Sequence, residues 1–138
     1  MKTILVALDG SETASRALKM AIELAGPLDA RLRLLHIINW WTPVVPPGVA
    51  EQLNTGAREF AQLLLNDSMK ICALANVPAD SEIASGTPAE ELAKAAEAHA
   101  VWMVIIGSHG RNPVQRILLG SVSTHLLHIC ERPVLVVR

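Results

Sequence analysis

The stretch ILVALDGSETASRALKMAIELA, residues 4–25, decides the fold class of this chain. It opens with a continuous apolar run over residues 4–8, which is typical of a strand buried on both faces of a sheet. Ser11 or Thr13 can then cap a helix, in which apolar residues recur at helical spacing. A Gly-Pro pair follows and ends that helix. The stretch therefore predicts a buried strand that leads directly into an amphipathic helix.

The same alternation of apolar strands and helices continues along the chain. Further strands and helices are predicted in turn over residues 32–38, 49–75, 81–84, 88–99, 101–106, 120–131 and 133–137. Strands that alternate with helices predict a parallel sheet with helices on both faces. We therefore expect an α/β fold with a doubly wound, mostly parallel, five-stranded sheet, in a single domain over residues 1–138.

Composition and charge exclude several classes of function. Hydrophobic residues make up 51% of the chain and charged residues 18%, which excludes a disordered chain. The formal net charge of -1 does not suit a nucleic-acid partner or an anionic membrane surface. No apolar run approaches the ~18 residues that cross a bilayer. Cys72 and Cys130 lie outside any metal-ligand spacing and are expected in the core, so a reducing cytoplasm is the simplest compartment.

Glycine and hydroxyl residues cluster after the fourth predicted strand, in the segment GSHGRNPVQRILLGSVS, residues 107–123. Gly107 and Gly110 allow the backbone to turn tightly and to approach a ligand with no Cβ in the way. Gly120 stands at the start of a helix, whose free N–H groups and dipole favour an anion. Hydroxyl donors and positive charge would complete a phosphate cradle, supplied by Ser121, Ser123, Arg111 and Arg116. Turn-forming glycines and a helix-capping serine explain the same residues equally well.

Other residues also have both a binding and a structural explanation. Asp9 ends the first strand, where a carboxylate either caps the following turn or accepts hydrogen bonds from a ribose. His36 lies inside an apolar strand and is predicted to be a hydrogen-bonded core residue. His125 and His128 share a helix, but a zinc site needs further ligands, so we expect no metal site. The tryptophans at 40–41 either form a lid or partner surface or cover an edge of the core.

Four separated segments together resemble the universal stress protein family. The spacing Gly107-x2-Gly110-x9-Gly120-Ser121 is similar to the nucleotide-binding signature of that family. The segments ILVALDGS, LLHI and RPVLVV, at residues 4–11, 34–37 and 132–137, also resemble the family and occur in its order. The resemblance covers essentially the whole chain and implies a Rossmann-like fold of the adenine nucleotide alpha hydrolase-like type. Because the glycine spacing is present, the chain resembles the ATP-binding branch.

The resemblance implies a ligand, a ligand set and a partner. It implies that ATP, with or without Mg²⁺, is bound with Asp9 at the nucleoside and with Ala7 and Ile37 around the adenine and sugar. The signature and its neighbours complete the expected set of nucleotide contacts: Gly107, Gly110, Gly120, Ser121, Val122 and Ser123. Universal stress proteins commonly pair through the last strand, so we expect a homodimer with residues 134–137 antiparallel across a twofold axis.

The function indicated by these observations is nucleotide binding in a stress response. The phosphate segment lacks a GxxxxGK[ST] sequence and paired carboxylates, which phosphoryl transfer commonly uses. We therefore expect no catalytic residues. Two alternatives stay open: a slow ATP hydrolase, in which His109 would orient a water molecule, and a protein-interaction module with a vestigial nucleotide site.

Overall fold

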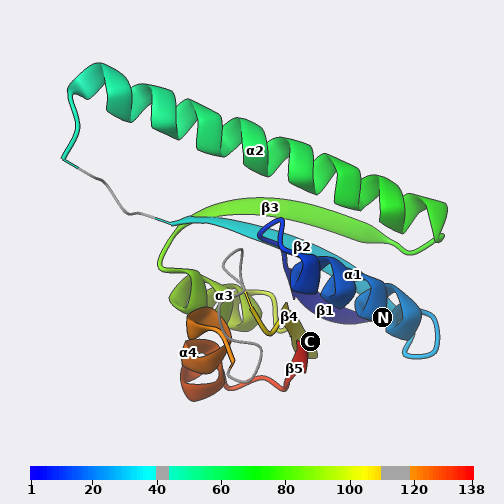
Figure 1. The fold of residues 1–138 in the computed structure, drawn as a ribbon. Helices are drawn as coiled ribbons and strands as arrows, with labels where there is room; N and C mark the ends of the chain where they lie inside the picture. Colours follow the sequence, from blue (N-terminus) through cyan, green and yellow to red (C-terminus); the bar gives the residue numbers. More distant parts are fainter. Residues whose placement is uncertain (40–43, 110–118) are drawn as a thin grey trace.

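The computed structural model describes residues 1–39, 44–109 and 119–138, in which strands and helices alternate (Figure 1). The strands are β1 Lys2–Ala7, β2 Ala30–Asn39, β3 Ala79–Gly86, β4 Met103–Gly107 and β5 Val134–Val137. The helices are α1 Glu12–Ala25, α2 Pro47–Leu74, α3 Pro88–Ala98 and α4 Ser121–Ile129. This order confirms the predicted succession of elements, whose ends differ by one or two residues. The tryptophans at 40–41 lie outside the described residues.

The strands form one sheet in the order β3-β2-β1-β4-β5. Every pairing is parallel, whereas the sequence predicts only a mostly parallel sheet. β1 is central, with Val6 beside Leu34 of β2 and Ile105 of β4. From β1 the chain moves outward to β2 and β3, then crosses to β4 and β5 on the other side. The switch point between β1 and β4 is where ligands bind in open α/β sheets, outside the carboxyl ends of the strands.

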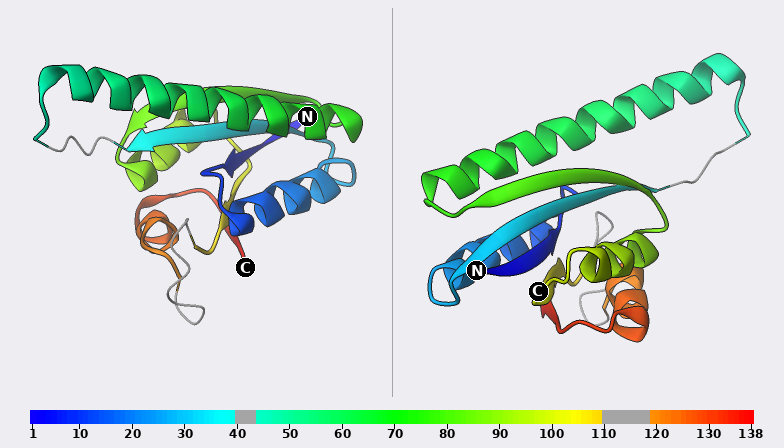
Figure 2. Two further views of the ribbon diagram at one scale, coloured as in Figure 1. Left: turned by 45° about the horizontal axis from the view of Figure 1, so that its top comes forward. Right: turned by 180° about the vertical axis from the view of Figure 1, so that it is seen from behind.

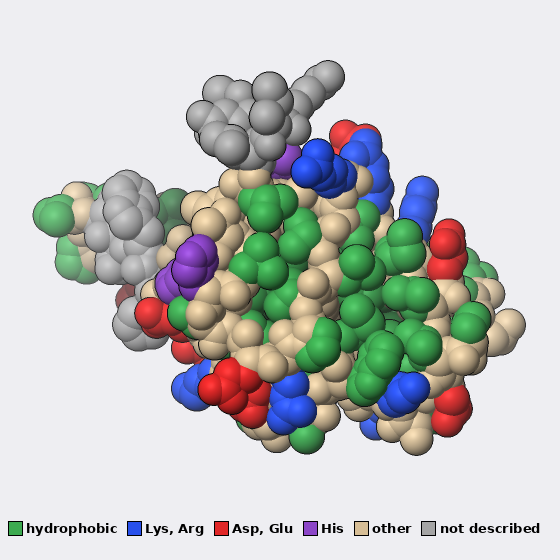
Figure 3. Space-filling model, turned by 90° about the horizontal axis from the view of Figure 1, so that it is seen from below, with side chains coloured by type: hydrophobic (Ala, Val, Ile, Leu, Met, Phe, Trp, Pro, Cys, Tyr) green, Lys and Arg blue, Asp and Glu red, His purple; other side chains and the backbone are tan. Residues whose placement is uncertain are grey.

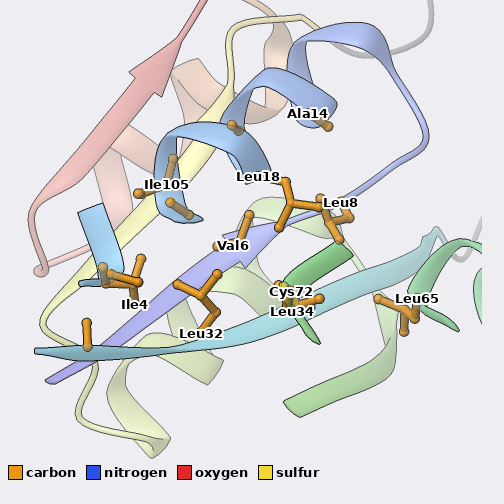
Figure 4. Packing of buried hydrophobic residues seen from close by; sticks show 14 residues of the cluster. Ile4, Val6, Leu8, Ala14, Leu18, Leu32, Leu34, Leu65, Cys72 and Ile105 are labelled. Atoms are coloured by element: carbon orange, nitrogen blue, oxygen red, sulfur yellow. The ribbon is translucent and has the colours of Figure 1, made fainter. Parts of the chain in front are cut away.

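Side chains of the central strands alternate between two cores. On one face, Ile4 and Val6 pack with Leu18 of α1 and with α2 (Figure 4). On the other face, Leu5 packs with residues of α3 and with Leu126 of α4. Figure 2 shows the helices on the two sides of the sheet. Because both faces are covered, the central strands are apolar at consecutive positions, as the sequence of residues 4–8 predicts.

Helix α2 extends beyond the strands that it covers (Figure 1). Its 28 residues rise about 42 Å, and residues 47–60 are mostly exposed. Its buried positions recur at helical spacing in the second half: Ala61, Leu65, Ser68 and Cys72. This burial confirms Cys72 as a core residue, whereas Cys130 is only half-buried and follows the last residue of α4. None of the helices in the described ranges is long and apolar enough to cross a membrane.

Strand β3 extends two residues further at each end than the sequence predicts. It pairs with β2 from Ala79 to Gly86, and several of these residues are polar. Arg33 of β2 donates hydrogen bonds to Asp80 at 2.9 Å and to Glu82 at 2.6 Å. These cross-strand ion pairs accommodate charged side chains that break the apolar pattern of the strand.

Strand β5 lies at one edge of the sheet. The Pro133 carbonyl oxygen accepts a hydrogen bond from the Val104 N–H of β4 at 2.8 Å, and the Val137 carbonyl oxygen accepts one from the Ser108 N–H at 2.7 Å. Because backbone groups alternate in direction along a strand, those of Val136 face away from β4. Figure 3 views the molecule from the side on which α4 and β5 lie, and hydrophobic side chains occupy the centre of this face. The edge position is the one that the predicted homodimer requires.

Candidate functional site

A cavity of about 270 Å³ opens at the carboxyl ends of β1, β2 and β4, beside the switch point. Eight of the residues that the sequence places at a nucleotide site line this cavity: Ala7, Asp9, Ile37, Gly107, Gly120, Ser121, Val122 and Ser123. The others, Gly110, Arg111 and Arg116, lie outside the described residues. Tertiary structure therefore brings together residues from three strands and one helix that are up to about a hundred positions apart.

The cavity has an apolar wall that the sequence does not identify. Apolar side chains from β2, β4 and α3 complete it, namely Leu35, Ile106, Pro88 and Leu92, and the polar Asn39 lines the cavity at the end of β2. A period-two pattern places Leu35 and Ile37 on one face of β2, but it does not reveal that α3 lies over them. The wall provides an apolar surface next to the polar groups of β1 and α4, which suits a ligand with an apolar ring and a charged part.

The N-terminus of α4 is directed to the cavity. Gly120 is the N-cap, with an extended backbone at φ −64° and ψ 164°, and no side chain among the described residues caps this end. The first three helical residues, Ser121, Val122 and Ser123, all line the cavity. The N–H groups of the first helical turn, which no described side chain caps, and the positive end of the helix dipole therefore lie where they favour an anion.

Ser123 has a structural bond that the sequence does not predict. Its side chain is 2% exposed, and its hydroxyl lies 3.2 Å from the Ser108 carbonyl oxygen and 3.1 Å from that of Gly120. A hydroxyl has one proton to donate. The Ser123 hydroxyl therefore shares its proton between the Gly120 carbonyl at the start of its own helix and the Ser108 carbonyl at the end of β4, whereas the sequence assigns it to the ligand.

The two described glycines of the signature have packing reasons of their own. A Cβ on Gly107 would lie 2.5 Å from Thr13 Oγ1 and 2.7 Å from the Ala14 nitrogen. A Cβ on Gly120 would lie 2.9 Å from the Ser108 carbonyl oxygen. Because these glycines have no side chain, α1 can pack closely against Gly107, and the end of β4 can pack closely against Gly120. The sequence explains Gly107 by the close approach of a ligand. In the structure, the packing of α1 explains the glycine without any ligand.

Asp9 both caps a turn and faces the cavity. Its Oδ1 accepts a hydrogen bond from the Ser11 N–H at 2.8 Å. This bond is the structural role that the sequence allows. A carboxylate has two oxygens and about four lone-pair sites, so this bond leaves capacity for ligand hydroxyls. The two explanations of Asp9 are therefore compatible.

The histidines occupy different environments. His36 is 8% exposed, its Nδ1 lies 2.7 Å from the Leu8 carbonyl oxygen, and its ring packs edge-on against Phe60. The carbonyl accepts, so Nδ1 carries the proton, and the prediction of a hydrogen-bonded core histidine is confirmed. His128 Nδ1 donates likewise to the Thr124 carbonyl at 2.8 Å. Within the parts of the chain described, no three His, Cys, Asp or Glu side chains are grouped to hold a metal ion.

Comparison with known proteins identifies relatives over the full length. The model of the universal stress protein family matches residues 1–138. Universal stress protein YxiE of Bacillus subtilis is 29% identical, and the match covers 98% of this chain and 97% of that protein. Universal stress protein MJ0531 of Methanocaldococcus jannaschii is 30% identical over 99% of this chain and 82% of its own length.

Solved structures share the fold. That of the hypothetical protein MJ0577 superposes with a TM-score of 0.91 at 33% identity, covering 99% of this chain and 94% of that one. More distant neighbours include an Arabidopsis thaliana universal stress protein family protein with AMP bound and an Archaeoglobus fulgidus universal stress protein in complex with dAMP. They are 16% and 18% identical, with TM-scores of 0.74 and 0.73, and they bear on the fold alone. Since the family model spans residues 1–138, this chain belongs to the universal stress protein family.

Proposed function

We propose that the cavity binds ATP, or a related adenine nucleotide, and that the protein acts in a stress response by binding rather than by turnover. One observation carries this proposal: Asp9 and the start of α4, for which no described side chain serves as a cap, line the same cavity at the switch point. A carboxylate there suits the hydroxyls of a ribose, and a free helix N-terminus suits phosphate.

The order of strands supports one orientation of the nucleotide. Ile37 ends the apolar wall on β2, Asp9 follows β1, and Ser108 and His109 follow β4. Neighbouring strands lie about 4.8 Å apart, so the three groups span about 10 Å along the sheet edge. In the proposed complex the adenine lies against the β2 wall, the ribose at Asp9 and the phosphates at α4. AMP and dAMP in the two distant relatives are nucleotides of the same class.

Slow hydrolysis is the second candidate, and one contact favours it. His109 lines the cavity, and its Nδ1 lies 2.8 Å from Ser108 Oγ. This bond fixes the ring in a position from which it could orient a water molecule. Binding is the better proposal, because the phosphate segment lacks the lysine and paired acids that commonly serve phosphoryl transfer.

Calorimetric titration of ATP with and without Mg²⁺ tests the binding proposal. Asp9→Asn keeps an oxygen for the Ser11 N–H and removes the charge. It should weaken ATP and adenosine by about ten- to a hundredfold, the value of a hydrogen bond to a charged group, and leave inorganic triphosphate unchanged. Asp29→Asn is the matched control, since Asp29 precedes β2 at the opposite end of the sheet and its side chain is 85% exposed.

Three results would each decide against a part of the binding proposal. Absence of heat at millimolar ATP with the unmodified protein would refute nucleotide binding. Equal losses of ATP and triphosphate affinity in Asp9→Asn would refute the placement of the ribose. Many turnovers per molecule, measured as ADP formed over a long incubation and lost in His109→Ala, would favour the hydrolase.

A further inference from the structure

The start of α1 is joined to the end of β4 by hydrogen bonds that the proposed nucleotide contacts do not use. Thr13 Oγ1 donates to the His109 carbonyl oxygen and accepts from the His109 N–H at 3.3 Å. Ser11 Oγ lies 3.3 Å from the same carbonyl oxygen. Thr13 and His109 are 96 positions apart, so this is a tertiary contact and not local capping of α1.

Gly107 makes this contact possible. A Cβ at this position would lie 2.5 Å from Thr13 Oγ1 and 2.7 Å from the Thr13 carbonyl carbon. The approach of the two segments therefore leaves no room for a side chain at position 107. Since one of these atoms belongs to the backbone of α1, the contact sets the distance between α1 and β4.

The connection continues from His109 to the start of α4. The preceding residue, Ser108, accepts the Gly120 N–H on its carbonyl oxygen at 2.6 Å, and the Ser123 hydroxyl lies 3.2 Å from that oxygen. Gly120 is the N-cap of α4. The start of α1, the end of β4 and the start of α4 are thus one hydrogen-bonded unit, which carries the anion-binding end of the cavity.

We propose that Thr13 is a positioning residue for the phosphate end of the nucleotide site. Its hydroxyl holds the His109 backbone against α1, which sets where α4 begins relative to Asp9. The inference rests on the proposed function and deepens it. Among the described residues, Ser11 and Ala14 line the cavity but Thr13 does not, so Thr13 acts through its neighbours and not as a ligand.

The proposal predicts a selective loss of affinity. The nucleoside end is built on β1 and β2, whereas the phosphate end depends on α4. Thr13→Val removes the hydroxyl and keeps the shape of the side chain. It should weaken ATP about tenfold, the combined value of two hydrogen bonds, and leave adenosine unchanged. Calorimetry on the full chain measures both ligands.

Two variants serve as controls. Thr13→Ser retains the hydroxyl and should bind ATP as the unmodified protein does. Thr55→Val makes the same replacement on the exposed stretch of α2 and should change neither affinity. Equal losses for ATP and adenosine in Thr13→Val, or no loss for either, would overturn the proposal. If Thr13→Val does not fold, Thr13→Ala is judged by the same criteria, and failure of both to fold would also overturn it.

Amide hydrogen exchange without nucleotide separates this inference from the proposed function. Thr13→Val should speed exchange of the His109 and Gly120 amides several-fold, and Thr13→Ser should not. Unchanged exchange in Thr13→Val would overturn the positioning role, whatever the protein binds. An unmodified protein that binds no ATP, with the exchange result as expected, would refute the nucleotide proposal and leave the link between α1 and α4 in place.

Discussion

The packing of Gly107 against α1 predicts a large effect for a very small substitution. In Gly107→Ala the new methyl group would lie 2.5 Å from Thr13 Oγ1 and 2.7 Å from both the Ala14 nitrogen and the Thr13 carbonyl carbon. Carbon atoms pack favourably at about 3.5–4.0 Å, so these contacts are too short by about 1 Å. Two of the three atoms belong to the backbone of α1, and no side-chain rotation relieves them.

The expected cost follows from this geometry. Overpacking a well-filled site destabilises proteins by about 1–3 kcal/mol, and a clash with backbone lies at the upper end of that range. Replacing glycine by alanine also restricts the unfolded chain, and this effect alone would raise the free energy of unfolding by about 0.5–1 kcal/mol. We expect a net loss of about 2 kcal/mol in the free energy of unfolding. With a urea m-value of about 2 kcal/mol/M, the midpoint should fall by about 1 M.

Urea unfolding monitored by circular dichroism measures this shift, and Gly56→Ala is the matched control. Gly56 lies in the exposed part of α2, and a Cβ there would meet nothing within 4 Å. The same substitution should therefore stabilise the protein by about 0.5–1 kcal/mol. A Gly107→Ala midpoint equal to that of the unmodified protein would refute the packing argument. If such a variant also lost ATP affinity, the glycine would be required for the ligand, as the sequence suggests.

Three further outcomes are expected. Val136→Pro should convert the predicted β5 homodimer into folded monomers in sedimentation equilibrium, because the backbone of Val136 faces the open edge and proline removes its N–H. An unmodified protein that is monomeric at micromolar concentration would contradict the pairing. The Cys72 thiol should resist alkylation at pH 8 while Cys130 reacts, since burial raises the pKa of Cys72 and leaves little thiolate; equal rates by mass spectrometry would contradict this. Ser123→Ala should lower the free energy of unfolding by about 1 kcal/mol in urea, because the buried hydroxyl no longer holds Ser108 to α4; an unchanged midpoint would show that this bond adds no stability.

The order of elements is readable from the sequence because each element leaves a local pattern. Apolar runs mark the strands that are buried on both faces, such as the one that includes Ile4 and Val6. Helices follow from the spacing of their apolar residues and from their caps. The full length of β3 is not readable, because Asp80 and Glu82 are stabilised by Arg33 on another strand. A local pattern contains no information about a distant partner.

The residues of the candidate site also differ in whether a local sequence pattern reveals them. Asp9 and Gly120 stand out because a polar residue at a strand end and a glycine at a helix start are local signals. Pro88 and Leu92 carry no such signal, since their place in the cavity wall depends on how α3 packs over β2. The same holds for Thr13, which in the sequence is only a candidate cap for α1.

By itself the sequence determined the α/β class, the alternation of elements and the segments that end beside the cavity, because hydrophobic periodicity and capping act over a few residues. Tertiary structure alone decided what several of these residues do. Gly107 leaves room for α1 to pack against β4, and the hydroxyl of Ser123 links the start of α4 to the end of β4. The physical reason is that steric exclusion and hydrogen bonding act between neighbours in space, and the neighbours of these two residues are set by how α1 and α4 pack beside the end of β4.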